Sequence, residues 1–449
     1  MKKIVYFGII CGLLSLGACK KFLDEKPNVV LATPTTLNDL QALLDHYQVL
    51  NFVDGSTTEV SSTDFYLTDA DFNAQSEQNQ RMYTWQKSDI YASSLNEWFY
   101  NYRAIYRANS VIGFLDEIPR NTVNQQQWEN ISGIAHFYRA KNLSKTLIAY
   151  ALNYRSGMAT EEIGVPIRLG TDFNQPSVRT SVAAGYSAII EDAQKAIASL
   201  PEVQTHVMRP NKPAAYALLA RIFMSMNDYD QAYRYADSAL RIKGDLLDFN
   251  ELNASAAFPV PQFNVEVLHD SFMPGTILSN ARAKIDPELY KLYDANDLRR
   301  TIFFKNNGNG TYGFKGSYEG SASLFSGIAT DEVYLMRAEC AARLNDLQQA
   351  VKDLNSLLNK RYRTGTFTPI IATTQAAVLE RVLLERRKEL LMRGLRWMDV
   401  KRLNVLGAQI TLKRTVNGVS YQLEPNSRGF ALPLPEDMLR ISGMPQNIY

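Results

Sequence analysis

Cysteine and histidine are scarce in this chain, with three and four copies in 449 residues. No two histidines stand at metal-ligand spacing, and there is no HExxH, CxxC or EF-hand loop, so no metal site and no cofactor are predicted. A GxSxG elbow and a P-loop are also missing. Gly308, Gly310 and Gly313 spell GxGxxG, but the next residues do not favour a helix, so we expect a loop there.

Long apolar runs are missing after the first 18 residues, so no later segment has the roughly 18 apolar residues that a membrane-spanning helix needs. At the N-terminus, two lysines precede an apolar run from Ile4 to Leu16, which is the pattern of a secretory signal peptide. Residues 16–19, Leu-Gly-Ala-Cys, resemble the lipobox of bacterial lipoproteins, in which the cysteine is acylated. The alternative is ordinary cleavage after Ala18, which would leave Cys19 as a free thiol.

The sequence therefore predicts a signal peptide over 1–18, a tether lipidated at Cys19 over 19–34, and one domain over 35–449. Position 20 is lysine rather than aspartate, so the inner-membrane retention signal is missing and an outer-membrane lipoprotein exposed at the cell surface is expected. Without the two lysines of the signal peptide, 46 basic residues balance 46 acidic ones. This neutral balance gives no reason to expect nucleic-acid binding.

Helical periodicity dominates the predicted domain, so we expect a mostly α fold. Helices are predicted at 35–50, 95–117, 125–154, 181–199, 213–243, 331–362 and 375–404. Long irregular loops are expected at 51–94 and 244–330, and a small β-hairpin is expected near 410–423. Asn417-Gly418 supplies the two-residue turn of that hairpin.

An internal repeat relates the segments near 213–243 and 331–362. Small and aromatic residues fall at matching positions in both, as in the helix pairs of tetratricopeptide repeats. Asn227 and Asn345 occupy the matching turns, which suits a residue that tolerates turn conformations. We therefore expect tetratricopeptide-type helix pairs.

The charged run 385–403 contains both signs of charge. Glu389 and Arg393 stand four residues apart, the spacing of a favourable helical pair. We expect a solvated, self-paired helix face rather than a nucleic-acid site.

Several motifs in one order resemble the SusD/RagB family of nutrient-binding outer-membrane lipoproteins. They are "CKKFLDEKP", "EWFYNYRAIYRANSVI", "GVPIRL", "EVYLMRAECAARLNDLQQAVKDLNSL", "ERRKELLMRGLRWMDVKRLN" and "LPLPEDMLRISGMPQNIY". The resemblance implies a SusD-like fold whose ligand-binding face is built from irregular loops. It also implies a glycan or peptide ligand, a TonB-dependent SusC-like transporter as partner, and no catalysis.

Aromatic and polar side chains in the loops are the candidate ligand contacts, because sugar C–H faces stack on flat rings while polar groups bond the hydroxyls. The candidates are Asp64, Tyr66, Arg81, Tyr83, Trp85, Trp98, Tyr312, Lys315 and Tyr318. Core packing is the alternative for each, and it is favoured for Trp98 by Tyr102 one turn away.

Two other functions remain open from the sequence. A surface glycosidase would need a pair of carboxylates, for which the candidates are Asp64, Asp69, Asp71 and Glu77. A repeat scaffold that binds only a protein partner would need no small-ligand site.

Overall fold

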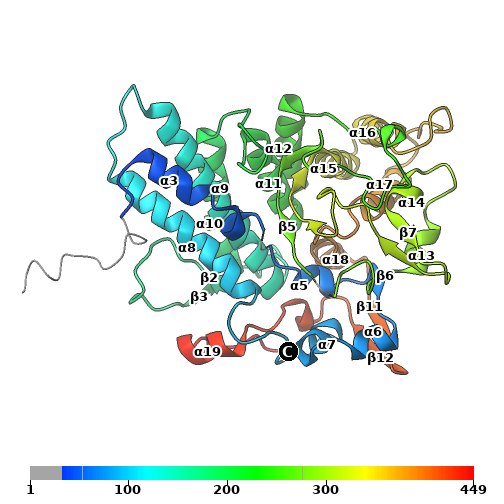
Figure 1. Ribbon diagram of the computed structural model, residues 1–449, viewed down its shortest axis with the longest axis horizontal. Helices are drawn as coiled ribbons and strands as arrows, with labels where there is room; N and C mark the ends of the chain where they lie inside the picture. The colour runs from blue at the N-terminus through cyan, green and yellow to red at the C-terminus, as the bar shows by residue number, and fades with distance from the viewer. Residues whose placement is uncertain (1–32, 53, 276) are drawn as a thin grey trace, which may run out of the picture.

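The computed structural model describes residues 33–52, 54–275 and 277–449 (Figure 1). The predicted signal peptide and Cys19 lie outside the described residues. The helices before residue 245 are α3 (Leu37–Leu44), α4 (Tyr47–Leu50), α5 (Thr57–Val60), α6 (Asp69–Asn73), α7 (Glu77–Tyr83), α8 (Glu97–Asp116), α9 (Gln125–Tyr150), α10 (Val182–Ser199), α11 (Lys212–Ser225) and α12 (Tyr229–Ile242). The later helices are α13 (Pro287–Lys291), α14 (Arg299–Ile302), α15 (Thr330–Arg343), α16 (Leu347–Asn359), α17 (Gln375–Glu389), α18 (Arg396–Val405) and α19 (Glu436–Ser442).

The strands are short and form antiparallel pairs. The pairs are β1 (Phe65–Tyr66) with β6 (Lys284–Ile285), β2 (Ile163–Pro166) with β3 (Arg179–Ser181), β4 (Val267–His269) with β10 (Ile328–Ala329), β5 (Phe272–Met273) with β9 (Leu324–Phe325), β7 (Phe304–Asn306) with β8 (Tyr312–Phe314), and β11 (Leu412–Val416) with β12 (Val419–Leu423). Among the described residues no helix is both long and apolar enough to span a bilayer.

The long helices pack one against the next, from α8 through α9, α10, α11, α12 and α15 to α16. Figure 1 shows this row crossing the upper part of the molecule, with α19 and the C-terminus along the lower edge. The predicted helix pairs are α11 with α12 and α15 with α16. Their interfaces are built from fully buried alanines such as Ala220, Ala236 and Ala338, whose small side chains allow close approach.

Local signals in the sequence set the ends of these elements. Thr36 caps α3, and Asp39 completes a capping box by accepting from the backbone N–H of Thr36. Asn227 and Asn345 adopt φ of 61° and 66° in the two predicted turns, which confirms their role. The hairpin is also confirmed, because Asn417 and Gly418 have φ of 51° and 74° between paired β11 and β12.

The prediction of one helix over 375–404 is wrong. The chain leaves the helix after Glu389 and re-enters one at Arg396, with Met392 and Gly394 at φ of 59° and 75°. A residue in the left-handed region ends an α-helix, and Gly394 accepts that conformation without strain.

The charged run is buried rather than solvated, which corrects a second prediction. Glu389 bonds Arg299 and Arg361, at 2.9 and 2.7 Å, and does not pair with Arg393. Arg299 also meets Asp297 and Glu385, and Arg361 meets Glu266, all with no exposed side-chain surface. Lys388 pairs with Asp297 and Glu385, and together with it residues 266, 297, 299, 361, 385 and 389 form a buried ion-pair network. Such a network is stable only when each charge is compensated, because desolvation of an unpaired ion is costly.

Candidate binding site

A groove of about 590 Å³ lies between α8, the loop of residues 166–177 and α19. We call it the α8 groove. Its rings come from Trp98, Phe99, Tyr102, Tyr106 and Phe173. A concave surface with several aromatic rings and a few polar groups is the usual form of a small-molecule site.

Three of these rings remain accessible in the α8 groove. Phe99 and Tyr106 are 40% and 39% exposed, and Phe173 is 81% exposed. Tyr106 and Phe173 stack with ring centroids 5.1 Å apart, so α8 and the loop present one aromatic platform. Exposed stacked rings give up solvent contact when a sugar ring covers them, which favours binding.

The loop wall of the groove is fixed to α8 by three hydrogen bonds. The Tyr102 hydroxyl donates to the Pro166 carbonyl at 2.8 Å. Asn109 Nδ2 donates to the carbonyls of Arg168 and Gly170, at 2.9 and 3.2 Å. A wall fixed in this way loses little freedom when a ligand binds.

A buried pair behind the groove holds Asn109 in turn. Arg139 Nη1 donates to Asn109 Oδ1 at 2.9 Å, and Arg139 also makes two bonds of 2.7 Å to Asp192. Burial raises the pKa of Asp192, but hydrogen bonds from Arg139 and His136 outweigh it and hold the pKa below its usual value. Asp192 therefore stays charged and keeps Arg139 in place.

The segment 85–95, which we call the strap, connects the α8 groove to a second groove. Trp85, Asp89, Ser94 and Leu95 have φ between 44° and 55°, a conformation that costs most residues about 1–2 kcal/mol each. Acids of α19 hold the strap, because Glu436 accepts from the Asp89 N–H at 2.7 Å and Asp437 from the Ser94 N–H at 2.9 Å. Strain of this kind persists only where surrounding contacts enforce it, and it is common at functional sites.

The second groove, of about 300 Å³, lies beside Trp85, β12 and the last residues of the chain. We call it the Trp85 groove. The Trp85 indole N–H donates to the Ser61 carbonyl at 3.0 Å, and Arg414 lies 4.9 Å from its ring. Trp85 is the one sequence-predicted candidate that lines this groove.

Five predicted contacts are buried and engaged with the protein itself: Asp64, Tyr83, Trp98, Lys315 and Tyr318. Asp64 pairs with Arg387 at 3.0 Å, and Lys315 donates to the Ala254 carbonyl at 2.6 Å. The Tyr318 hydroxyl donates to Glu266 and lies 3.1 Å from Asp331 Oδ2. Side chains with almost no accessible surface cannot stack on or bond a ligand. The structure therefore gives a packing or pairing role, rather than ligand contact, to four of the five: Asp64, Tyr83, Lys315 and Tyr318. Trp98 forms the largely buried floor of the α8 groove.

Tyr66, Arg81 and Tyr312 are partly exposed and line neither the α8 groove nor the Trp85 groove. Tyr66 pairs in β1 with Lys284, and Arg81 pairs with Glu77 at 2.9 Å. Tyr312 stacks on Tyr290 with centroids 3.7 Å apart. Their role in binding stays a prediction.

The acids considered for a glycosidase each have a structural partner. Asp69 accepts from the Asn417 N–H at 2.7 Å, and Asp71 lies 3.3 Å from Lys284 Nζ. Asp64 is paired to Arg387 and Glu77 to Arg81, and none of the four acids lines the α8 groove or the Trp85 groove.

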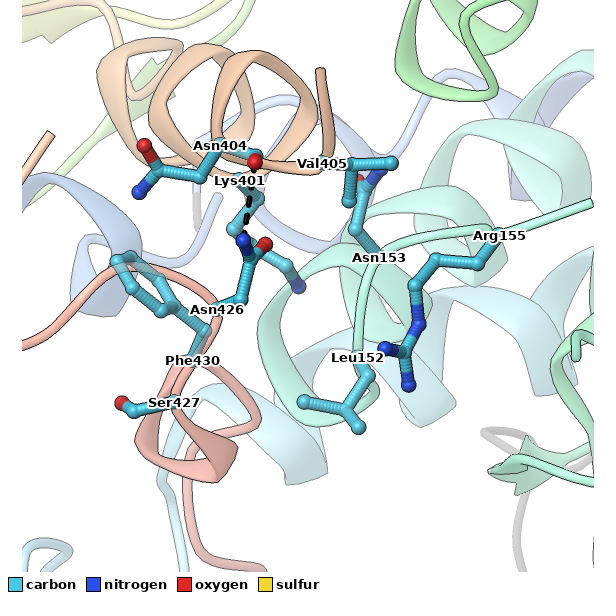
Figure 2. Close-up of a pocket in the computed structure, with 9 residues that line it drawn as sticks. All are labelled: Leu152, Asn153, Arg155, Lys401, Asn404, Val405, Asn426, Ser427 and Phe430. Carbon is cyan, nitrogen blue, oxygen red and sulfur yellow. Dashed lines mark hydrogen bonds between the residues drawn. The ribbon is translucent and has the colours of Figure 1, made fainter. Parts of the chain in front are cut away.

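Two other hollows have less suitable linings. One, of about 630 Å³ near Tyr362 and Phe367, has four short polar side chains among its nine lining residues. Figure 2 shows the other, where the Asn426 amide donates to the Asn404 carbonyl of α18, and its volume of about 20 Å³ is that of a single water. Burial lowers the pKa of Lys401 to about 7, although the Ile148 and Ala151 carbonyls accept its bonds. Within the described residues, no group of three acids, histidines or cysteines is placed to hold a metal ion.

Residues 21–224 match the family described as "Starch-binding associating with outer membrane", and residues 329–433 match the one described as "SusD family". The two matches together support a protein of the SusD/RagB family. A SusD-like protein P2 of Formosa agariphila is 24% identical over an alignment of 332 residues, and the match covers 58% of this chain. The matched part spans 64% of that relative, just under two thirds of its length.

Solved structures share the SusD-like fold over nearly the whole chain. A protein of Bacteroides vulgatus titled a putative sugar binding protein gives a TM-score of 0.75 at 21% identity, covering 92% of this chain and 99% of its own. A SusD superfamily protein of Bacteroides thetaiotaomicron gives the same TM-score and identity, covering 92% and 100%. The predicted mostly α, SusD-like fold is confirmed.

The sequence reading missed the exposed rings of the α8 groove. Phe99 and Tyr106 were hidden in the periodicity of a helix, where aromatic residues usually pack. Phe173 gave a usable signal, because it stands between Asp172 and Asn174 in a polar stretch ending at Pro176, where no core is expected.

Proposed function

We propose that this protein is a lipid-anchored, non-enzymatic surface protein that captures oligosaccharides and passes them to a TonB-dependent, SusC-like transporter. The α8 groove is its proposed capture site. The observation that carries the proposal is the accessible platform of Phe99, Tyr106 and Phe173 on a wall held by internal hydrogen bonds. A ligand that is transferred intact needs a surface of this kind and no reacting groups.

The family match supports the choice of ligand. One matched family is described as starch-binding and associated with the outer membrane, and a structural neighbour is titled a sugar binding protein. The two grooves joined by the strap give room for an oligomer rather than a single sugar.

Binding and product release should be measured together on the purified full chain with a panel of oligosaccharides and peptides. We expect retention of an oligosaccharide without cleavage, and about fivefold weaker binding in Tyr106→Ala and Phe173→Ala, because stacking on each ring contributes about 1 kcal/mol. The control is Phe263→Ala, which removes a ring of the same 39% exposure as Tyr106 outside both grooves. Trp85→Ala tests whether the ligand also occupies the Trp85 groove.

Three results would contradict the proposal. Release of shortened products would indicate a glycosidase, and binding of peptides alone would exclude oligosaccharide capture. An equal loss of affinity in Phe263→Ala and Phe173→Ala would show that the α8 groove is not the site.

The transfer step requires a complex in the outer membrane. Chemical crosslinking on cells that carry the full chain should recover a TonB-dependent transporter. Recovery should fall in Cys19→Ala, because acyl chains hold the protein at the membrane surface. Unchanged recovery from that variant would show that the lipid is not needed for the contact.

A further inference from the structure

The charges around the α8 groove are not balanced. Arg103 and Arg168 line it from α8 and from the loop, and Asp437 is its lining acid. Asp437 is already occupied, since it accepts from the N–H groups of Ser94 and Met438. The groove therefore carries two arginines against one carboxylate, and both oxygens of that carboxylate already accept hydrogen bonds from the backbone.

Arg103 is the less satisfied of the two arginines. Its Nε is buried and has no hydrogen-bond partner, and its Nη2 reaches the Gln48 carbonyl only at 3.5 Å. No ion pair forms at Arg103 within the described residues, although most buried or half-buried arginines of this chain have a carboxylate. By contrast, Arg168 donates to the carbonyls of Asp172 and Gln175, both at 2.6 Å, and so shapes the loop.

A second arginine adds to the positive charge of α8. Arg107 stands one turn after Arg103, also without an ion pair in the part of the chain that the structure describes. Burial and then the charge of Arg103 lower the pKa of Arg107. Like charges at this spacing destabilise a helix by a few tenths of a kcal/mol, and a bound anion would remove that cost.

Two rings of the aromatic platform, Phe99 and Tyr106, lie on the same helix as Arg103 at adjoining positions. Phe99 precedes Arg103 by four residues and Tyr106 follows it by three, spacings that bring side chains together on a helix surface. The guanidinium carbon of Arg103 lies 5.4 Å from the Phe99 ring centroid. A sugar ring stacked on the platform would place its substituents within reach of a cation.

We propose that the α8 groove selects oligosaccharides that carry anionic groups, carboxylate or sulfate, and that Arg103 is the residue that recognises the charge. This inference rests on the proposed function, of which it names the ligand class. Arginine suits the role because its planar donors form paired bonds with carboxylate and sulfate oxygens, and such charge-assisted bonds are stronger than neutral ones.

The test compares matched ligands that differ only in charge, using the full chain in detergent. One pair is an oligogalacturonate and its methyl ester of equal length, and the other is a sulfated oligosaccharide and its desulfated form. We expect one charged form to bind about tenfold more tightly than its neutral partner, a preference that decreases with salt. The pair that shows the preference distinguishes carboxylate from sulfate.

Variants assign the effect to one side chain. Arg103→Gln should abolish the preference by weakening the binding of the charged form. An unchanged urea unfolding curve would show that the variant is folded. Arg103→Lys should keep part of the preference, because lysine retains the charge without the paired donors. Arg234→Gln, an exposed arginine of α12 that pairs with Asp230, is the control and should change nothing.

The outcomes separate this inference from the proposed function. Equal binding of charged and neutral forms would overturn the anionic preference and leave oligosaccharide capture supported. A preference that persists in Arg103→Gln would overturn the role of Arg103. Failure of every oligosaccharide to bind would overturn both, as would tight binding of an acidic peptide alone.

Discussion

The hydrogen bonds that fix the loop wall to α8 should control both the order of the loop and the affinity of the groove. Tyr102→Phe removes one bond, from the hydroxyl to the Pro166 carbonyl, and leaves the ring in place. Asn109→Ala removes two bonds to the loop and also the acceptor of Arg139. The two variants therefore loosen the same wall to different extents.

The expected magnitudes follow from these bonds. A buried hydrogen bond contributes about 1 kcal/mol, so Tyr102→Phe should lower the free energy of unfolding by about 1 kcal/mol. Asn109→Ala loses two such bonds and leaves an Arg139 donor unpaired, for a total of about 3–4 kcal/mol. Against a typical total of about 5–15 kcal/mol, both variants should still fold.

Urea unfolding measures these losses, and amide hydrogen exchange of residues 167–178 measures the order of the loop. We expect faster exchange there in both variants, with oligosaccharide affinity lowered severalfold. Tyr334→Phe is the matched control, because it loses a bond of 3.0 Å to the Gly244 carbonyl away from the groove. It should cost a similar amount of stability without changing the loop. Unchanged exchange at 167–178 in Asn109→Ala would refute the reasoning.

Three further predictions concern the strap, a buried acid pair and the anchor. Leu95→Asn should raise the free energy of unfolding by about 0.5–1 kcal/mol, measured by urea unfolding, since Leu95 has φ of 44° and asparagine tolerates that conformation better. Burial and the facing Asp270 raise the pKa of Glu319 to about 8, so its contribution to stability is complete below pH 4.5 and is lost as pH rises through 8. Glu319→Gln should therefore have a free energy of unfolding about 1–3 kcal/mol above that of the natural chain at pH 9, and nearly equal to it at pH 5. Equal differences at the two pH values would contradict this. Cys19→Ala should move the protein from the membrane fraction to the soluble fraction, and retention in the membrane would exclude the lipid as its anchor.

The elements that the sequence predicted well are those encoded by local patterns. The helix pairs around Asn227 and Asn345 follow from periodicity and turn chemistry, both of which act over a few residues. Asn417-Gly418 likewise determines its hairpin with little help from the rest of the chain. The boundaries of α8 and α10 lie within two residues of the predicted segments for the same reason.

The candidate site could be predicted only in part, because it depends on contacts between distant segments. Phe173 reaches Tyr106 only because the loop returns to α8, and nothing local in either segment specifies that contact. The same limit explains Glu389, whose partners Arg299 and Arg361 lie far away in sequence while Arg393 stands at a suitable local spacing. A sequence does not distinguish buried ion pairs from exposed ones, because the same charged residue types form both.

The buried ion-pair network has a consequence for how this half of the molecule folds. Its members come from residues 266, 297–299, 361 and 385–389, so no charge is fully compensated until these separate segments have assembled. A partly assembled form would hold an unpaired buried ion, which costs about 3–5 kcal/mol. The network therefore acts as a source of cooperativity. It raises the free energy of partly folded intermediates. A chain that ends before residue 385 would leave Arg299 and Arg361 without the carboxylates of Glu385 and Glu389.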